Sequence, residues 1–483
     1  MPQDFVPKRL FHRRAVLAGA AAMLVISPAG AQVFSDIGRP PLRPARPIPA
    51  MLQAAGLGQA QLGMAVLDPA TGALLDGWSE DLPMPPASTL KIMTALYALD
   101  RLGPSHRFAT RVLRRGDMLV LAGGGDPVLD TDALAVLARM TAAAAGDWRP
   151  AGFAVWGEAL PRMERIAPEQ AAQLAYNPAL SGIMLNHNRV HLGWRCEDSC
   201  SLDLTARGNR HAPRAFTIRA GMVGGNGFGH AIEDGHEVWT IPRSRLGRTG
   251  TRWLPVRAPE LYAGDVFQTL CRAEGLVLPA PEILPGPPEG DEITRIDSPP
   301  LREVLRGMLE YSTNLTAEAV GLAASGAADL RGSAIATGAG TAVLHDHSGL
   351  GADSRISALT LARLLCDPNR AAILRPLLNR NPLTQTLEER AQGDGRGGHP
   401  LVQAKTGTLN FVSNLSGYAR FPDSVERAFA IMIGDADRSA ASRGNELPVG
   451  VPGWTDRARL LQRDLIARAG RMPQTPPVPM PEI

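Results

Sequence analysis

Lysine is rare in this chain, and its positions draw attention to two segments. The sequence has 50 Lys and Arg residues together, but its only lysines are Lys8, Lys91 and Lys405. Arginine stays protonated at any accessible pH, whereas a desolvated lysine amine near another cation can lose its proton and act as a base. Lys91 and Lys405 are therefore the first candidates for a catalytic role.

Ser88 lies three residues before Lys91, at the start of an apolar segment, 88–99, that is stopped by Gly103-Pro104. This pattern predicts a buried helix. Residues i and i+3 share one face of a helix, so the Lys91 amine is expected beside the Ser88 hydroxyl. Free backbone N–H groups at the helix start could also hold a developing oxyanion. The pair suits a nucleophile and its base, although S-x-x-K alone arises readily by chance.

Two further motifs carry polar groups at useful spacings. Lys405-Thr406-Gly407-Thr408 leads into a predicted strand, where glycine lets a ligand backbone approach and pair with the free N–H groups of an edge. Ser312-Thr313-Asn314 places a hydroxyl and an amide two residues apart, at a predicted turn between helices. Taken alone, these three residues could simply cap the next helix.

The order S-x-x-K, S-x-N, K-T-G is the mark of penicillin-binding proteins and β-lactamases. The long separation of Ser88 from Ser312 resembles the class C low-molecular-mass penicillin-binding proteins, the S13 D-alanyl-D-alanine carboxypeptidases and endopeptidases, which insert extra domains between these motifs. Further segments fall in that family's order across most of the chain. They are 86–91, 124–127, 181–190, 312–318, 348–350 and 404–417.

The resemblance implies a set of site residues. The catalytic side chains would be Ser88, Lys91, Ser312, Asn314 and Lys405. The substrate-binding residues would be Thr406, Gly407 and Thr408. In this assignment Ser88 is acylated after activation by Lys91, Ser312 and Asn314 relay protons and hold the substrate amide, and Lys405 with Thr406 grips the terminal carboxylate. The backbone N–H groups of Ser88 and Thr408 would form the oxyanion hole.

The partners that follow from the resemblance are peptidoglycan stem peptides as substrates and β-lactams as covalent inhibitors. Serine acylation with an internal lysine base needs no cofactor. No metal site is expected, because His187 with His191 and the His345-Asp346-His347 segment lack an obvious set of further ligands. Gly224 to Gly229 is not a dinucleotide fingerprint, since the residues that follow read as a strand.

Two segments depart from the family pattern. The family often has Asp-Gly-Ser-Gly-Leu where this chain has Asp346-His347-Ser348-Gly349-Leu350, and Asn410-Phe411 stands where a small residue is common. Both could alter the rim of the cleft, which leaves subsite preference open.

Two other functions share part of this pattern. Class A β-lactamases use a glutamate between the second and third motifs to deacylate penicillin, but no Glu occurs from Ala319 to Leu387, and those enzymes lack the long insertion. A non-catalytic peptidoglycan-binding or sensor protein could keep the same fold, but it would not need every motif residue.

The sequence predicts an α+β fold in which an antiparallel sheet packs against helices. Strands are expected at 62–67, 73–78, 409–421 and 427–433. Helices are expected at 88–99, 301–324 and 456–469. The resemblance implies a penicillin-recognising, transpeptidase/β-lactamase-like domain with a β-rich insertion. The expected division is a signal peptide at 1–31, a catalytic domain at 32–107 plus 297–470, the insertion at 108–296 and a disordered Pro-rich tail at 471–483.

The first 31 residues have the order of a secretory signal peptide. Lys8 and the Arg13-Arg14 pair precede the apolar run 15–26, and Ala29-Gly30-Ala31 follows. Cleavage is expected before Gln32, with export to the periplasm by the general or the twin-arginine route. The mature protein should be soluble or only peripherally membrane-attached. The full sequence has a net charge of only +3, and the mature region contains no basic run, so the charge pattern does not indicate nucleic-acid binding.

The four cysteines fall into two groups. In an oxidising compartment Cys196 and Cys200 could close a short loop. Cys271 and Cys366 lie in apolar, helix-like contexts and are expected to be buried thiols.

Overall fold

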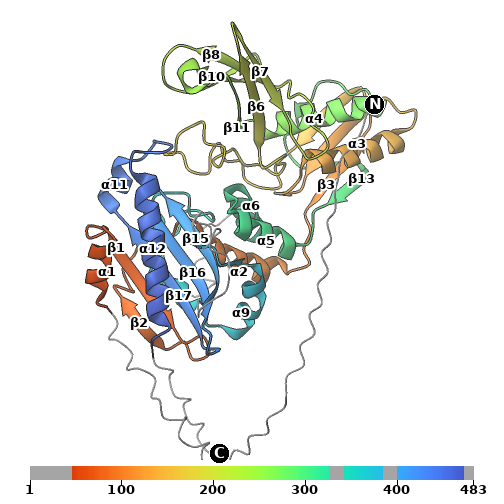
Figure 1. Ribbon diagram of the computed structural model, residues 1–483. Coiled ribbons are helices and arrows are strands. Elements are labelled where there is room, and N and C mark those ends of the chain that lie inside the picture. Colours follow the sequence, from red (N-terminus) through yellow and green to blue (C-terminus); the bar gives the residue numbers. More distant parts are fainter. Residues whose placement is uncertain (1–45, 326–341, 384–399, 473–483) are drawn as a thin grey trace, which may run out of the picture. The chain divides into compact units, whose positions relative to one another are not determined.

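The computed structural model describes residues 46–325, 342–383 and 400–472 (Figure 1). The predicted signal peptide and residues 473–483 of the predicted tail lie outside the described residues. From Arg46 onward the chain forms one compact unit. No described helix has both the length and the apolar character needed to cross a bilayer.

A six-stranded antiparallel sheet joins the two ends of the described chain. Its strand order is β14-β15-β16-β17-β1-β2. The strands are β1 (Gln61–Leu67), β2 (Leu74–Trp78), β14 (Asn379–Arg380), β15 (Leu401–Leu409), β16 (Val412–Arg420) and β17 (Glu426–Gly434). The predicted hairpin and the predicted pair of C-terminal strands are confirmed, and β1 pairs with β17 in the centre of the sheet.

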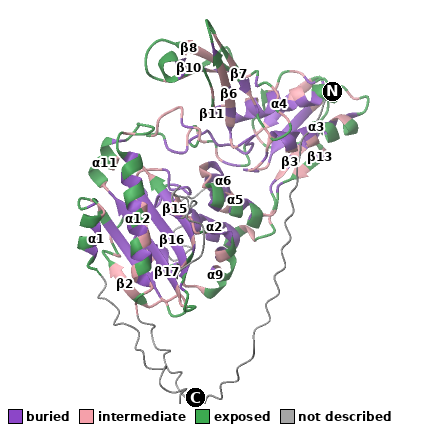
Figure 2. Ribbon diagram, viewed as in Figure 1, coloured by how far each residue is buried: buried purple, intermediate pink, exposed green. Residues whose placement is uncertain are grey.

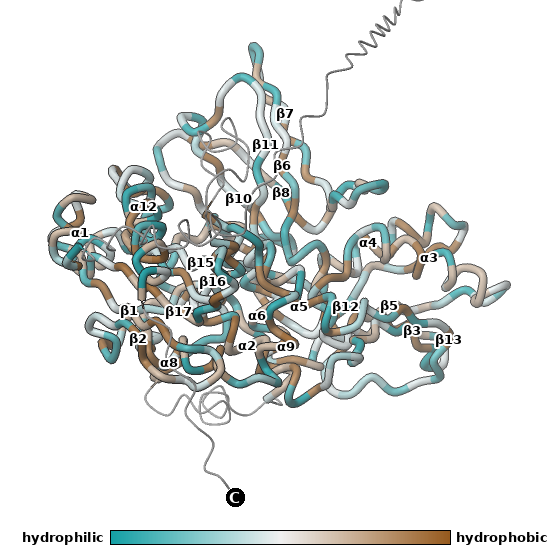
Figure 3. Tube along the Cα trace, turned by 60° about the horizontal axis from the view of Figure 1, so that its bottom comes forward, coloured by the Kyte–Doolittle hydropathy of each residue, from teal (hydrophilic) through white to brown (hydrophobic). Residues whose placement is uncertain are grey.

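Helices cover both faces of this sheet, so its central strands β16 and β17 are buried except at one end of each (Figure 2). On β1, Met64 and Val66 pack in one apolar cluster with α1 (Ile48–Ala54) and α12 (Val451–Ala469). Ala65 and Leu67 face the opposite way, into the cluster of α2 (Leu90–Leu102), α5 (Leu301–Tyr311) and α8 (Ala358–Arg363). This alternation is the period of two of a strand buried on both faces. The hydrophobic residues of α2 and β17 are brown in Figure 3.

The predicted helices are confirmed with shifted ends. The expected helix at 88–99 begins as a 3₁₀ turn, Ala87–Thr89, and runs on as α2 to Gly103, whose φ of 82° ends it. The helical stretch expected at 301–324 is two helices, α5 and α6 (Asn314–Ser325), separated at the predicted turn, where Ser312 adopts the left-handed conformation. The final helix, α12, begins five residues earlier than expected.

The segment from β3 to β13 contains three further sheets. The first is five-stranded with order β12-β5-β4-β3-β13. Its strands are β3 (Ala109–Arg115), β4 (Met118–Gly123), β5 (Gly152–Trp156), β12 (Glu282–Ile283) and β13 (Asp291–Asp297). The others are β8-β10-β9, from Ile218–Val223, His236–Pro242 and Gly229–Glu233, and β11-β6-β7, from Thr249–Pro255, Arg189–Cys196 and Cys200–Thr205.

The insertion is β-rich as predicted, but it also holds two helices of 15 residues that the sequence analysis did not anticipate. They are α3 (Thr131–Ala145), capped by the Asp130 side chain, and α4 (Pro259–Ala273). Both pack in the apolar cluster that includes residues of β4 and β5. Because the described chain forms one compact unit, the boundaries at 108 and 296 stay a prediction.

Strand pairing and an apolar cluster are among the connections that tie the insertion to the rest of the chain. Its first and last strands, β3 and β13, are antiparallel neighbours, and the amide of Ser298 donates to the carbonyl of Phe108 at 2.8 Å. An apolar cluster also joins Leu180 and Met184 of the insertion to Leu315 and Ala319 of α6.

Three of the four cysteines behave as the sequence suggested, whereas Cys366 was expected to be buried and is only partly so. Cys196 and Cys200 form a disulfide at the end of the β6–β7 hairpin, which decides the alternative left open above. Cys271 is a buried free thiol, and Cys366 is half-buried.

Candidate active site

The turn that carries Ser88 is held against the sheet by two contacts. Asn414 of β16 donates its side-chain N–H groups to the carbonyls of Pro85 and Pro86, both at 2.8 Å. Gly407 of β15 lies so close that an added Cβ would be 3.0 Å from the Pro86 oxygen and 3.1 Å from the Ser88 nitrogen. Glycine is therefore favoured at this position, because a Cβ would push the K-T-G strand away from the backbone of the turn.

Lys91 is fully buried, and its amine has three oxygen partners. The Nζ atom lies 3.0 Å from Ser88 Oγ, 2.8 Å from Asn314 Oδ1 and 2.8 Å from the carbonyl oxygen of Ser348. The amide and carbonyl oxygens can only accept hydrogen bonds, whereas a hydroxyl can also donate. A neutral amine has two N–H groups and one lone pair. When both N–H groups point at the two obligate acceptors, the lone pair faces the Ser88 hydroxyl.

The surroundings of Lys91 favour that neutral form. Burial and, to a smaller extent, the charge of Lys405 lower its pKa from 10.5 to about 7, although the charges of Asp346 and Glu318 act in the opposite direction. Desolvation disfavours the ammonium because an apolar interior replaces its hydration. The lowered pKa favours a neutral Lys91 amine near neutral pH.

Ser312 and Asn314 lie where α5 ends and α6 begins, and each side chain meets a lysine. Ser312 Oγ lies 2.9 Å from the Nζ atom of Lys405, which also donates to the carbonyl of Thr406 at 2.9 Å. Burial lowers the pKa of Lys405 to about 8. The Asn314 amide meets Lys91 with its oxygen and donates from Nδ2 to the carbonyl of Tyr176 at 3.0 Å.

The strand β15 has an open edge beside these groups. Its short neighbour β14 pairs only with Gln403 and Ala404. Within the part of the chain that the structure describes, no strand pairs with the outer edge of β15 from Lys405 to Leu409. The predicted edge position of the K-T-G segment is therefore confirmed, and its free backbone groups can receive an extended peptide.

A cavity of about 570 Å³ lies along this edge. Its floor brings together side chains of all three motifs, namely Ser88, Ser312, Asn314, Thr406 and Thr408. Other wall residues come from the insertion, namely Glu169, Gln170 and Tyr176. The two lysines lie beneath the floor, in contact with Ser88 and Ser312.

A buried carboxylate supports the site and was not singled out from the sequence. Glu318 accepts the N–H groups of His347 and Ser348, the latter at 2.9 Å. Burial, together with the nearby charge of Asp346, raises its pKa to about 7. By holding the Ser348 amide, Glu318 fixes the turn whose carbonyl meets Lys91. One signal was available, because Glu318 follows Asn314 by four residues on α6 and so shares its face.

The other candidate groups play no such part. Burial lowers the pKa of His187 to about 4, and His191 contacts Arg207. Across the described ranges no three His, Cys, Asp or Glu side chains are grouped so that they could hold a metal ion. The segment Gly224 to Gly229 leads from β8 into β9 rather than into a helix.

Comparison with known proteins gives one consistent set of relatives. The family model described as the D-Ala-D-Ala carboxypeptidase 3 (S13) family matches residues 45–191 and 240–449, which include every site residue named above. A D-alanyl-D-alanine carboxypeptidase of Actinomadura sp. (strain R39) is 29% identical over 439 residues, which is 80% of each chain. The carboxypeptidase Rv3627c of Mycobacterium tuberculosis is 31% identical over 386 residues, covering 74% of this chain and 72% of that one. The crystal structure of penicillin-binding protein 4 from Haemophilus influenzae superposes with a TM-score of 0.68 at 19% identity, covering 87% of this chain and 98% of that one.

Proposed function

The chain belongs to the D-Ala-D-Ala carboxypeptidase 3 (S13) family of serine peptidases, and on this premise we propose that it cleaves D-Ala-D-Ala bonds of peptidoglycan stem peptides through an acyl-enzyme on Ser88. The family and the penicillin-binding-protein fold inferred from the motif order are both confirmed. The proposal extends to cross-link hydrolysis and to covalent trapping by β-lactams.

The observation that carries the proposal is the set of three oxygens around Lys91. With Asn314 Oδ1 and the Ser348 carbonyl occupied by its N–H groups, a neutral Lys91 accepts the Ser88 proton. Ser88 Oγ then attacks the carbonyl carbon of the penultimate D-alanine, so that the Oγ–C bond forms as the proton moves to Lys91.

Ser312 supports the second half of acylation. The C–N bond breaks and the terminal D-alanine leaves as an amine, which must gain a proton. The Ser312 hydroxyl, hydrogen-bonded to Lys405 and lining the same cavity, is placed to deliver it, and it is reprotonated by the proton that Lys91 took from Ser88, which leaves Lys91 neutral again. In deacylation the neutral Lys91 takes a proton from water as the water oxygen adds to the acyl carbon. The C–Oγ bond then breaks, and Lys91 returns that proton to Ser88 Oγ.

Binding of the substrate uses the open edge of β15. A protonated Lys405 and the Thr406 hydroxyl attract the terminal carboxylate of the stem peptide. The backbone N–H groups of Ser88 and Thr408 stabilise the oxyanion, and one such donor typically lowers the barrier by about 3 to 4 kcal/mol. The close approach of Gly407 to the Ser88 nitrogen supports this pairing of donors from the turn and the strand.

Labelling by a fluorescent penicillin tests the nucleophile. The parent protein and Ser439→Ala should be labelled equally, because Ser439 lines the same cavity without contacting Lys91. Ser88→Ala should not be labelled, and equal labelling of that variant would refute the assignment.

A digest of peptidoglycan separates the remaining functions. Incubation with the protein, followed by mass analysis, should show muropeptides that have lost D-alanine or a cross-link. Penicillin acylation with unchanged muropeptides would favour a binding or sensor protein, and rapid turnover of penicillin would favour a β-lactamase.

We also propose that the chain is exported, with cleavage before Gln32. The order of charged, apolar and small residues at 8–31 supports this. The disulfide between Cys196 and Cys200 is consistent with an oxidising compartment such as the periplasm.

A further inference from the structure

We propose that Arg257, a residue of the insertion, is a positioning residue for the active site: it fixes the segment 164–177 so that the carbonyl of Tyr176 orients the amide of Asn314. This inference rests on the proposed function, which assigns Asn314 to the catalytic machinery. It gives the insertion a defined part in the reaction.

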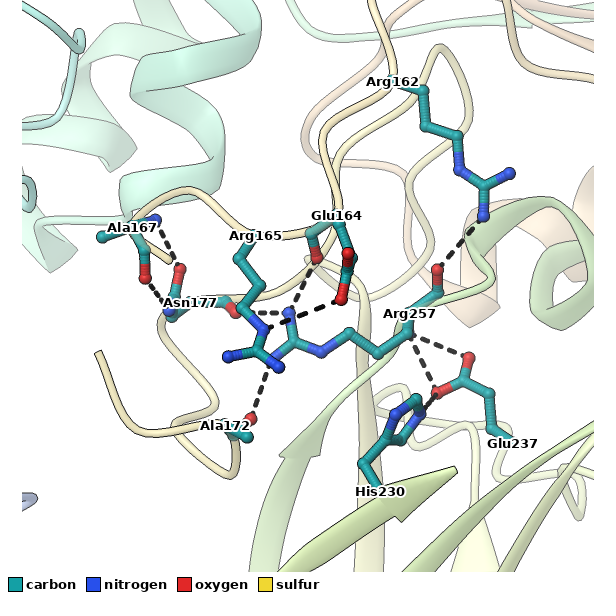
Figure 4. A network of polar contacts seen from close by, with 9 residues as sticks. All are labelled: Arg162, Glu164, Arg165, Ala167, Ala172, Asn177, His230, Glu237 and Arg257. Carbon is teal, nitrogen blue, oxygen red and sulfur yellow. Dashed lines mark hydrogen bonds and ion pairs between the residues drawn. The ribbon is translucent and has the colours of Figure 1, made fainter. Parts of the chain in front are cut away.

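Arg257 lies buried between the end of β11 and the start of α4, with its side chain directed into the segment 164–177 (Figure 4). Its guanidinium donates to three backbone carbonyls of that segment. The acceptors are Glu164 at 2.9 Å, Asn177 at 2.8 Å and Ala172 at 2.7 Å. The segment contains no helix or strand, so its buried carbonyls need partners from elsewhere. The single guanidinium of Arg257 therefore donates hydrogen bonds to carbonyls at both ends of the segment and to one between them.

The segment is also cross-braced within itself. Asn177 exchanges two hydrogen bonds with the backbone of Ala167, accepting at 2.9 Å and donating at 2.7 Å. Together with the arginine, this pair leaves the Tyr176–Asn177 peptide little freedom to rotate.

Arg257 is in turn held from the opposite side by Glu237 of β10. The Glu237 carboxylate accepts the backbone N–H of Arg257 at 2.9 Å and that of Ala258 at 2.6 Å. His230 of β9 lies 3.3 Å from the same carboxylate (Figure 4). Burial lowers the pKa of Arg257 to about 10, and the charge of Arg165 contributes, so the guanidinium stays charged at neutral pH.

The segment meets the active site at Tyr176. Its carbonyl accepts the Nδ2–H of Asn314 at 3.0 Å, while Asn314 Oδ1 faces Lys91. A carbonyl can only accept, so it holds the nitrogen of the amide on its own side and the oxygen towards Lys91. The opposite orientation would bring Nδ2 against the lysine amine and remove one of its two obligate acceptors. Nδ2 keeps a second hydrogen for the substrate amide.

The test is a double-mutant cycle between Arg257→Lys and Asn314→Ala, read as the rate of acylation by a fluorescent penicillin. Lysine keeps the charge but lacks the planar fork that reaches three carbonyls. Arg257→Lys should slow acylation about tenfold or more in the parent protein, and by less than about twofold when Asn314 is already Ala, because coupled residues are not additive. Arg162→Met is the matched control, since Arg162 is exposed and donates only to the carbonyl of Arg257. It should acylate like the parent.

The proposal would be overturned if Arg257→Lys slowed acylation equally in the parent protein and in the Asn314→Ala protein. It would also be overturned if Arg257→Lys did not slow acylation in the parent protein. If Arg257→Lys does not fold, as judged by its melting curve, Glu237→Gln takes its place in the cycle, because it keeps the shape but weakens the anchor of Arg257. Failure of the proposed function has a different signature, in which Asn314→Ala and Ser88→Ala both acylate like the parent.

Discussion

Acylation by a β-lactam should depend on pH with a bell shape, because one lysine of the site must be neutral and the other charged. Lys91 accepts the Ser88 proton only when it is neutral, so the rate falls as pH drops through its pKa of about 7. Lys405 attracts the carboxylate of the β-lactam only when it is charged, so the rate falls again as pH rises through its pKa of about 8.

The two values fix the size of the effect. The neutral fraction of Lys91 is about one half at pH 7 and about 1% at pH 5, whereas an unshifted amine would be neutral in only about three molecules in ten thousand at pH 7. The acylation rate should follow the product of the neutral fraction of Lys91 and the charged fraction of Lys405. This product is largest at about pH 7.5 and roughly 60-fold lower at pH 5.

The assay is the second-order rate constant for labelling by a fluorescent penicillin, measured from pH 5 to 10 at constant ionic strength. Melting curves over the same range would confirm that the protein stays folded. Lys405→Arg is the informative variant, because arginine stays charged and should remove the alkaline limb while the acid limb persists. The role assigned to Lys91 would be refuted if the rate constant did not change between pH 5 and 7.5. It would also be refuted if the rise of the rate constant with pH, which reports the loss of the Lys91 proton, had its midpoint near pH 10.

Three further outcomes are expected. Glu318→Gln should move the acid limb to lower pH, since the Glu318 charge raises the pKa of Lys91; the same titration checks this, and a shift to higher pH would contradict it. Gly407→Ala should slow penicillin labelling at least about tenfold, because its Cβ would press on the backbone of the nucleophile's turn. Gly221→Ala is the control, because nothing lies within 4 Å of its added Cβ, and it should be labelled at the parent's rate. Equal labelling rates for the two variants would count against a tight contact between Gly407 and the turn that carries Ser88. Mass analysis of the protein recovered from the periplasm should find Gln32 as the first residue, and a retained N-terminus would argue against cleavage there.

The parts of the site that depend on local spacing could be predicted from the sequence. Ser88 and Lys91 face each other because three residues separate them at a helix start, and Gly407 marks a strand that another backbone approaches. The hairpin before Ser88 and the strands after Lys405 follow from alternating apolar residues and clear turns. In each case the signal is contained in a short window.

The rest of the site depends on backbone groups that residue types do not reveal. The carbonyls of Ser348 and Tyr176 orient Lys91 and Asn314, yet any residue supplies a carbonyl. The insertion's helices α3 and α4 had local signals, such as Asp130 as a cap and Pro259 at the first helical position. Those signals were outweighed by the frequent Gly and Pro residues around them.

The pairing of β3 with β13 has a consequence for the order in which this chain acquires its structure. The nucleophile's turn precedes its anchor Asn414 by 328 positions, and ordering so long a loop in one step is slow. The insertion's strands pair among themselves, so this segment can form early and bring Phe108 beside Ser298. Once β3 and β13 have paired, only a few residues outside the insertion connect α2 to α5. We therefore expect the insertion to fold before the catalytic sheet, which can close only once the strands beyond Leu401 have been synthesised.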